Sequence, residues 1–213
     1  MKFMSVPDIL NNCSLVNKFW CHEARRFLRD KRTCTLCTAL IESDRDVKVM
    51  ENLLNSSVIP FNKISVYCPQ EFETGVRPLM VRLEQQILQL VERMKLKSLY
   101  IYEDGKELPH NERGMSRIMI EQALRKNSGT IEEISICFMP SMTSVLLGQY
   151  EEPGDLGSFF KGLLTSKNFA LPVLRTLAFY REQKVWTGLL ERCISPIIAA
   201  APQLQNVKRV SQD

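Results

Sequence analysis

The chain has 213 residues, which suits one ordinary domain or a small domain joined to a medium one. Its hydrophobic fraction is 45 % and its charged fraction 24 %, as in soluble globular proteins, and a formal net charge of +4 is low for a nucleic-acid-binding domain. No apolar run approaches a membrane span, no signal peptide opens the chain, and seven scattered cysteines indicate reduced thiols, so we expect a cytoplasmic or nuclear protein that binds neither membrane nor nucleic acid.

Residues 1–32 are predicted to be helical and to lack strands. Pro7 and Asp8 can open a helix after Ser5, and apolar residues then follow at helical spacing, namely Ile9, Leu10, Cys13, Val16, Phe19 and Trp20. The basic stretch from Arg25 to Arg32 indicates a solvated helix end, where cations offset the helix dipole. Contact with a phosphate or an acidic partner is the alternative interpretation of this stretch.

The rest of the chain alternates between short segments rich in strand formers and longer segments with apolar residues at every third or fourth position. Strands are predicted at 33–40, 63–68, 97–102, 132–138, 175–180 and 205–210. Helices are predicted along apolar stripes that begin at Leu83, Met115, Leu156 and Trp186, and Pro196 is expected to break the last helix into two pieces. Strands separated by helices favour parallel pairing, so we predict an α/β fold with a parallel sheet.

An apolar-x-x-apolar-x-apolar pattern recurs in these strands. Its copies begin at Phe61, Leu96, Ile131, Leu174 and, more loosely, Leu204, with separations of 35, 35, 43 and 30 residues. Recurrence at such intervals indicates stacked β/α units, because one unit cannot bury its own apolar face. An ordinary open α/β sheet is the alternative, since its buried strands show the same alternation.

Near the N-terminus the chain reads Ser14-Leu15-Val16-Asn17-Lys18-Phe19-Trp20, with Glu23-Ala24-Arg25 shortly after. This run resembles the second half of an F-box. The Pro-x-Leu-x-x-Leu/Val steps at Pro172 and Pro202 are similar to the leucine-rich repeats that often follow an F-box. The resemblance implies a partial, helical F-box over 1–32 and irregular leucine-rich-repeat-like β/α repeats over 33–213, which would form a solenoid with a parallel sheet.

The resemblance implies a non-enzymatic, substrate-recognition subunit of an SCF-type ubiquitin ligase. The F-box would bind a Skp-family adaptor, and through it a cullin, while the repeats hold an unknown target protein. The adaptor contacts that it implies are Pro7, Ile9, Leu10, Leu15, Val16 and Trp20. Two alternatives stay open: a non-ligase leucine-rich-repeat scaffold, whose residues 15–20 pack on the first repeat as a cap, and a small α/β enzyme.

Both chain ends depart from the family pattern. A complete F-box begins with a Leu-Pro-x-Glu-Ile/Leu helix, of which only residues 1–4 would remain here. We therefore expect a fragment, a mis-set start codon, or a variant that binds the adaptor weakly or not at all. The chain stops just after its last predicted strand, without the polar cap that repeat arrays need, so we expect either missing repeats or an exposed last edge.

Three segments that follow predicted strands, 69–78, 103–112 and 139–154, should leave one edge of a parallel array. We place target recognition there, on Phe72, His110, Met142 and Tyr150, with tolerated surface insertions as the alternative. No catalytic residue, metal site or cofactor is predicted. Cys34 and Cys37 have metal-like spacing, but they lack a second ligand pair and fall on opposite faces of a strand, and the chain has no phosphate-binding loop.

Overall fold

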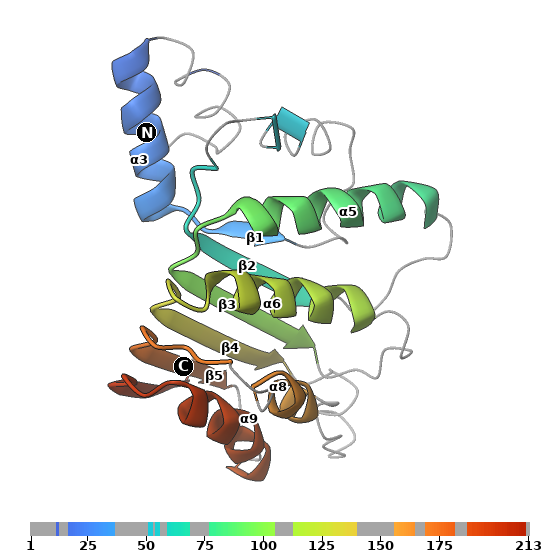
Figure 1. Cartoon of the computed structure of the whole chain (residues 1–213), viewed down its shortest axis with the longest axis vertical. Coiled ribbons are helices and arrows are strands. Elements are labelled where there is room, and N and C mark those ends of the chain that lie inside the picture. The colour runs from blue at the N-terminus through green and yellow to red at the C-terminus, as the bar shows by residue number, and fades with distance from the viewer. Residues whose placement is uncertain are drawn as a thin grey trace.

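A computed structural model describes residues 12, 17–36, 51–52, 54–55, 59–68, 77–104, 113–139, 156–164, 169–181 and 187–211. Within them, helices and strands alternate along the chain (Figure 1). The helices are α3 (Lys18–Lys31), α5 (Arg77–Arg93), α6 (Arg113–Asn127), α8 (Leu156–Leu164) and α9 (Thr187–Ala200). The strands are β1 (Cys34–Leu36), β2 (Lys63–Cys68), β3 (Ser98–Asp104), β4 (Glu133–Met139), β5 (Thr176–Arg181) and β6 (Asn206–Ser211).

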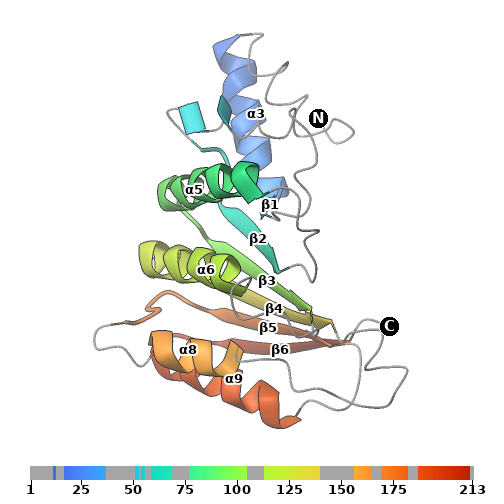
Figure 2. The same ribbon diagram turned by 90° about the vertical axis from the view of Figure 1, so that its right-hand side faces the viewer.

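The six strands form one sheet in which each neighbouring pair is parallel. Their order across the sheet, β1-β2-β3-β4-β5-β6, is also their order along the chain. Helices α5, α6, α8 and α9 cover one face of this sheet, and α3 stands beyond its β1 end (Figure 2). The predicted α/β fold with a parallel sheet is therefore confirmed.

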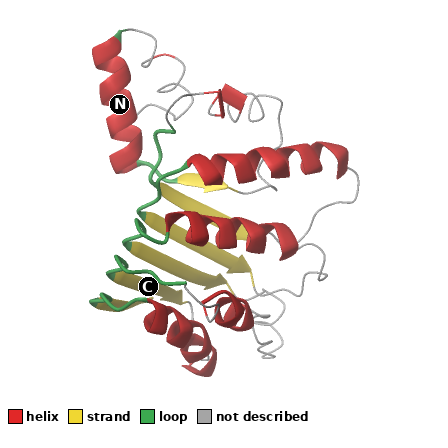
Figure 3. Cartoon of the chain, viewed as in Figure 1, coloured by secondary structure: helices red, strands yellow, loops and turns green. Residues whose placement is uncertain are grey.

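Strands β2 to β6 begin at the predicted residue or one residue after it, and β1 lies within the segment predicted for it (Figure 3). The recurring apolar pattern also matches the register between strands. Its second positions pair across the sheet as one row, formed by Ile64, Leu99, Ile134, Leu177 and Val207. Its third positions form the next helix-side row, Val66, Ile101, Ile136, Phe179 and Arg209. Equivalent residues of successive units thus lie side by side.

The same hydrogen-bonded joint precedes β3, β4, β5 and β6. At the first joint, the carbonyl of Asn62 accepts from the backbone N–H groups of Lys97, at 2.7 Å, and Ser98, at 3.1 Å. A carbonyl has two lone pairs and accommodates both donors. The carbonyls of Lys97, Glu132 and Arg175 do the same for the units that follow them. This repeated joint holds each strand in step with the one before it.

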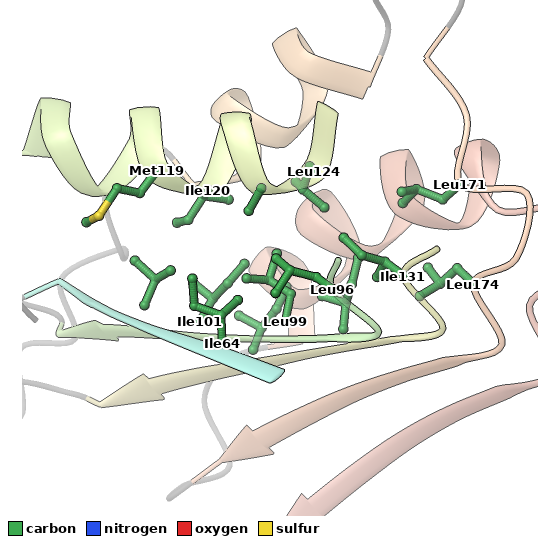
Figure 4. Packing of buried hydrophobic residues seen from close by; sticks show 14 of the residues in the cluster. Ile64, Leu96, Leu99, Ile101, Met119, Ile120, Leu124, Ile131, Leu171 and Leu174 are labelled. Atoms are coloured by element: carbon green, nitrogen blue, oxygen red, sulfur yellow. The ribbon is translucent and has the colours of Figure 1, made fainter. Parts of the chain in front are cut away.

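The core lies between the sheet and the helices that cover it (Figure 4). On α6, the buried stripe consists of Met119, Ile120, Ala123 and Leu124, at the spacing of one helix face. The first residue of each of three pattern copies, Leu96, Ile131 and Leu174, is fully buried where the chain enters a strand. Burial of each such Leu or Ile contributes about 1.5–3 kcal/mol. A single apolar layer therefore runs from β2 to β5.

Helix α6 ends at Asn127, and a turn follows. Asn127 is buried and connects two units. Its Oδ1 accepts from the backbone N–H of Leu96 at 2.8 Å, and its Nδ2 donates to the carbonyl of Ala123 at 3.1 Å. The hydroxyl of Thr130 donates to the carbonyl of Leu96 at 2.8 Å. Both backbone polar groups of Leu96 are satisfied in this way.

The expected break of the last helix at Pro196 was wrong, because α9 continues through this residue. Proline has no N–H to donate and crowds the preceding turn, which disfavours a helix interior. Ile194, Ile197 and Ala200 nevertheless keep their buried positions in the core. Packing of this face holds the two halves in one helix against the local preference.

Candidate functional site

Asn17 is the N-cap of α3. Asn17 has extended backbone angles, φ −166° and ψ 176°, and its Oδ1 accepts from the backbone N–H of Trp20 at 2.9 Å. An asparagine at this position satisfies one of the free N–H groups of the first turn. The Asn17-Lys18-Phe19-Trp20 segment therefore starts the helix and fixes both aromatic residues in its first turn.

Trp20, Ala24 and Leu28 are four residues apart and share one face of α3. Ala24 and Leu28 are fully buried in the core, whereas Trp20 is 43 % exposed and Phe19 is 67 % exposed. The rings of Phe19 and Trp20 meet edge to face, with centroids 6.2 Å apart. Figure 1 shows the reason: the C-terminal end of α3 meets the sheet and its N-terminal end projects past it. One apolar stripe is thus covered at one end and open at the other.

The basic stretch ends α3. Arg29 and Lys31 lie in its last turn, where a positive charge offsets the helix dipole. Arg26 lies 3.7 Å from a carboxylate oxygen of Glu23 and 4.0 Å from one of Asp30, and all three side chains are partly or largely exposed. This geometry fits the predicted solvated helix end, and exposed pairs of this kind contribute little to stability.

Most of the residues predicted for the two binding sites lie outside the described part of the chain. These are Pro7, Ile9, Leu10, Leu15 and Val16 for the adaptor, and Phe72, His110, Met142 and Tyr150 for the target. Strands β2, β3 and β4 are parallel and in register, so their ends at Cys68, Asp104 and Met139 share one edge of the sheet. The segments named for target recognition follow these ends in the sequence.

A polar and aromatic cluster on the helix-free face was missed by sequence reasoning. The hydroxyl of Tyr100 donates to Oε2 of Glu133 at 3.3 Å, and Oγ of Ser98 donates to the same oxygen at 3.2 Å. Burial, and then the charge and hydrogen bond of Glu133, raise the pKa of Tyr100 to about 12. The pKa of Tyr102 is raised too, first by burial and then by the charges of its neighbours Cys137 and Tyr180. These phenols are therefore neutral hydrogen-bonding groups.

The resemblance to an F-box rests on the sequence Ser14–Trp20, with Glu23–Arg25 after it. No protein-family model, curated protein or solved structure matches this chain. The functional interpretation of α3 therefore depends on its sequence and on the geometry described above.

Cys34, the first residue of β1, packs against the core. Burial raises its pKa to about 12, so the metal-binding and nucleophilic thiolate form is not populated near neutral pH. Cys37 lies outside the described residues. In the part of the chain that the structure describes, no group of three His, Cys, Asp or Glu side chains is placed to hold a metal ion. None of the described helices is long and apolar enough to cross a membrane.

Proposed function

We propose that this chain is the substrate-recognition subunit of an SCF-type ubiquitin ligase and catalyses no reaction itself. Its N-terminal helical segment binds a Skp-family adaptor and thereby a cullin, and its β/α units bind a target protein in the cytoplasm or nucleus. The observation that carries the proposal is the exposed Phe19–Trp20 pair, held in the first turn of a capped helix at the head of the row.

The physical case for adaptor binding starts from exposed aromatic area. A tryptophan that is 43 % exposed beside a phenylalanine that is 67 % exposed presents a large apolar surface to water. Aromatic anchors on a helix that enters a partner groove supply most of the binding energy in such interfaces. Pro7, Ile9, Leu10, Leu15 and Val16 complete the proposed contact with Trp20.

We propose further that the β/α units form an irregular leucine-rich-repeat-like solenoid. Three observations support this: the strand order follows the chain, the pattern positions pair in register, and the same two-donor joint recurs four times. Stacked units behave in this way because each buries the apolar face of its neighbour. The segments after β2, β3 and β4, with Phe72, His110, Met142 and Tyr150, are the proposed target-binding surface.

A second candidate function is an interaction scaffold without a ligase link. The observation that favours it is the burial of Ala24 and Leu28, which makes α3 part of the same core as the strands. In that case α3 is the first layer of the row, and its exposed aromatic end has another partner or none.

The test is the affinity of the chain for a purified Skp-family adaptor. We expect Trp20→Ala to weaken binding by about 2 kcal/mol or more, since a central aromatic anchor is removed. Ile198→Ala is the matched control, because Ile198 is 45 % exposed but lies on α9, at the far end of the molecule. If the wild type and Trp20→Ala bind the adaptor with equal affinity, Trp20 is not part of the interface.

A second arm of this test adds a complete F-box first helix ahead of Met1. Adaptor binding by this longer chain, lost on Trp20→Ala, supports the ligase proposal. No binding by either chain, with the fold intact by circular dichroism, favours the scaffold instead.

A further inference from the structure

The face of the sheet opposite the helices carries tyrosines beside small buried side chains. None of the described helices lies on this face (Figure 2). The register places Tyr100, Ser135 and Ala178 in one row across β3, β4 and β5. Ser135 and Ala178 are buried, whereas Tyr100 and Tyr180 are partly exposed. The tyrosines are therefore the members of this group that meet solvent.

The tyrosines lie on both sides of β4. Tyr100 and Tyr102 belong to β3, and Tyr180 belongs to β5. Tyr180 contributes to the raised pKa of both β3 tyrosines, because the phenol groups are close enough to interact electrostatically. Ser135 is the register partner of Tyr100, and the residue two positions after it, Cys137, is the register partner of Tyr102 and Tyr180. The three phenols therefore surround this part of β4.

Glu133 of β4 places a carboxylate on the same face. Its Oε2 accepts from the hydroxyl of Tyr100 at 3.3 Å and from Oγ of Ser98 at 3.2 Å. Among the described residues, no hydrogen bond reaches Oε1 and no ion pair includes Glu133. The cation in its row, Lys63, lies two strands away and donates to the carbonyl of Asp30 at 3.4 Å. No described cation therefore neutralises the carboxylate beside the tyrosines.

Ser135 adds a hydroxyl that makes no hydrogen bond. Its side chain is 2 % exposed, and its Oγ has no partner among the described residues. A buried polar group without a partner is unfavourable, and a ligand that supplies the partner removes this penalty. Ser135 lies on the same face as Glu133, about 6.5 Å further along the strand. One branched donor can therefore reach both side chains.

We propose that this face binds an arginine side chain of the target protein, between Tyr100 and Tyr180 and against Glu133. A guanidinium has five N–H donors in a planar fork, so one donates to Oε1 of Glu133 and another to Oγ of Ser135. The tyrosine rings turn to uncover the hydroxyl and then bind the cation on their faces, as interface side chains commonly change rotamer on binding.

Lysine is the less suitable occupant. Its ammonium is a compact, strongly hydrated charge, and it has no planar group that stacks on an aromatic ring. A second copy of this chain is not favoured either, because its own helix-free face would bring another Glu133 against the first, and like charges repel. The observations therefore favour a guanidinium from a different protein.

The proposal rests on target binding by the β/α units and deepens it by naming the side chain that the target presents. It does not depend on the adaptor contact. The site lies on β3, β4 and β5, whereas α3 with its Phe19–Trp20 pair stands beyond β1 (Figure 1). Target binding and adaptor binding can therefore be measured separately on the same variants.

The test uses the full chain and a short fluorescent peptide with a central Val-Arg-Val sequence. The matched probe has citrulline in place of arginine, which keeps the shape of the side chain and removes its charge. We expect the arginine peptide to bind about tenfold more tightly, because its hydrogen bonds to Glu133 are charge-assisted. Added salt should reduce this difference, since the site is partly exposed.

Two variants locate the charge. Glu133→Gln keeps an oxygen that accepts from Tyr100 and Ser98 but removes the negative charge, so it should bind the two peptides equally. Glu132→Gln makes the same charge change one residue earlier, on a side chain that pairs with Lys97 at 3.0 Å. This control should keep the preference for arginine. Circular dichroism and thermal unfolding show that both variants are folded.

Ser135→Ala separates binding from folding. Removal of a buried hydroxyl that has no partner should leave the melting temperature equal or raise it. The affinity for the arginine peptide should nevertheless fall several-fold, because one acceptor is lost. A purely structural role of Ser135 would change the melting temperature and leave the affinity as it is, and that result overturns the proposal.

Three further results overturn it: equal binding of the arginine and citrulline peptides by the wild type, a preference that survives Glu133→Gln, or its equal loss in Glu132→Gln. A lysine peptide that binds as tightly as the arginine peptide overturns the assignment to a guanidinium. A dimer in sedimentation that Glu133→Gln abolishes shows that the face contacts a second copy instead. Adaptor affinity should be the same for the wild type and Glu133→Gln, so failure of this site and failure of the ligase proposal are distinguishable.

Discussion

Asn127 satisfies backbone groups on both sides of a joint between units. Its side chain accepts from Leu96 N–H and donates to the carbonyl of Ala123, and it is buried. Leaving a buried N–H without a partner is more costly than the net value of the bond itself. The residue therefore contributes to stability through the groups that it keeps paired.

We expect Asn127→Ala to lower the free energy of unfolding by about 1–3 kcal/mol, because the N–H of Leu96 loses its acceptor in a dry position. Urea denaturation measures the change. Lys126→Ala, at the neighbouring exposed position, is the control and should change stability by less than about 0.5 kcal/mol. Similar values for the two variants contradict the assignment.

Tyr100 links stability to alkaline pH. Its pKa is raised from 10.0 in the reference state to about 12 in the folded chain. Above pH 10 the unfolded chain releases a proton that the folded chain retains, so this contribution is complete below pH 10 and is lost as the pH rises through about 12. We expect Tyr100→Phe to make the alkaline fall in stability shallower, as measured by denaturation at a series of pH values. An equally steep fall in the variant contradicts this.

At the scale of single elements, α9 shows packing overriding local preference. Pro196 lies in the interior of a helix of 14 residues and leaves one backbone carbonyl of the preceding turn without its usual donor. The buried residues that follow it, Ile197 and Ala200, hold the helix on the sheet.

We expect Pro196→Ala to stabilise the protein, by up to about 3 kcal/mol, since alanine restores the N–H and is the best helix former. Thermal unfolding measures the gain. Ile198→Ala is the control, because Ile198 is exposed two residues later and its replacement raises helix propensity without adding an N–H. A lower melting temperature for Pro196→Ala means that the proline fits this helix.

The strands were predictable from the sequence for two reasons. Apolar and polar residues alternate within each copy of the pattern, and the copies recur at intervals of 30 to 43 residues. The exposure of Trp20 was not, since Trp20, Ala24 and Leu28 share one helix face and only the position of the sheet decides which of them is covered. The Tyr100 cluster was missed for a related reason. Alternation places Tyr100 opposite Leu99 and Ile101, but its partner Glu133 is 33 residues away, and only the register of β3 with β4 brings them together.

At the scale of the whole molecule, the position of a unit in the row decides how deeply its apolar residues are buried. Leu177 of β5 and Val207 of β6 are neighbours in register, yet the first is fully buried and the second is 48 % exposed. The helix-side residues of β3, β4 and β5 are buried, whereas those of β6 are exposed. Residues at the same position of the pattern therefore contribute different amounts to the free energy of unfolding in different strands.

We expect Leu177→Ala to cost about 2–5 kcal/mol, through lost burial and the cavity that remains. Val207→Ala should cost below about 1 kcal/mol, because half of that side chain already meets water. Denaturant midpoints of the two variants measure the contrast. A large loss for Val207→Ala indicates that β6 is covered in solution.

The exposure of Trp20, at the N-terminal end of α3, has a spectroscopic consequence. Trp20 is one of two tryptophans in the chain, and its indole is partly in contact with water. In a Trp186→Phe background the emission of the protein comes from Trp20 alone, and transfer of an indole from water to an apolar groove shifts its emission to the blue. The residue proposed as the anchor thus serves as its own optical reporter of docking, and a quencher such as iodide gives its accessibility before and after a partner binds.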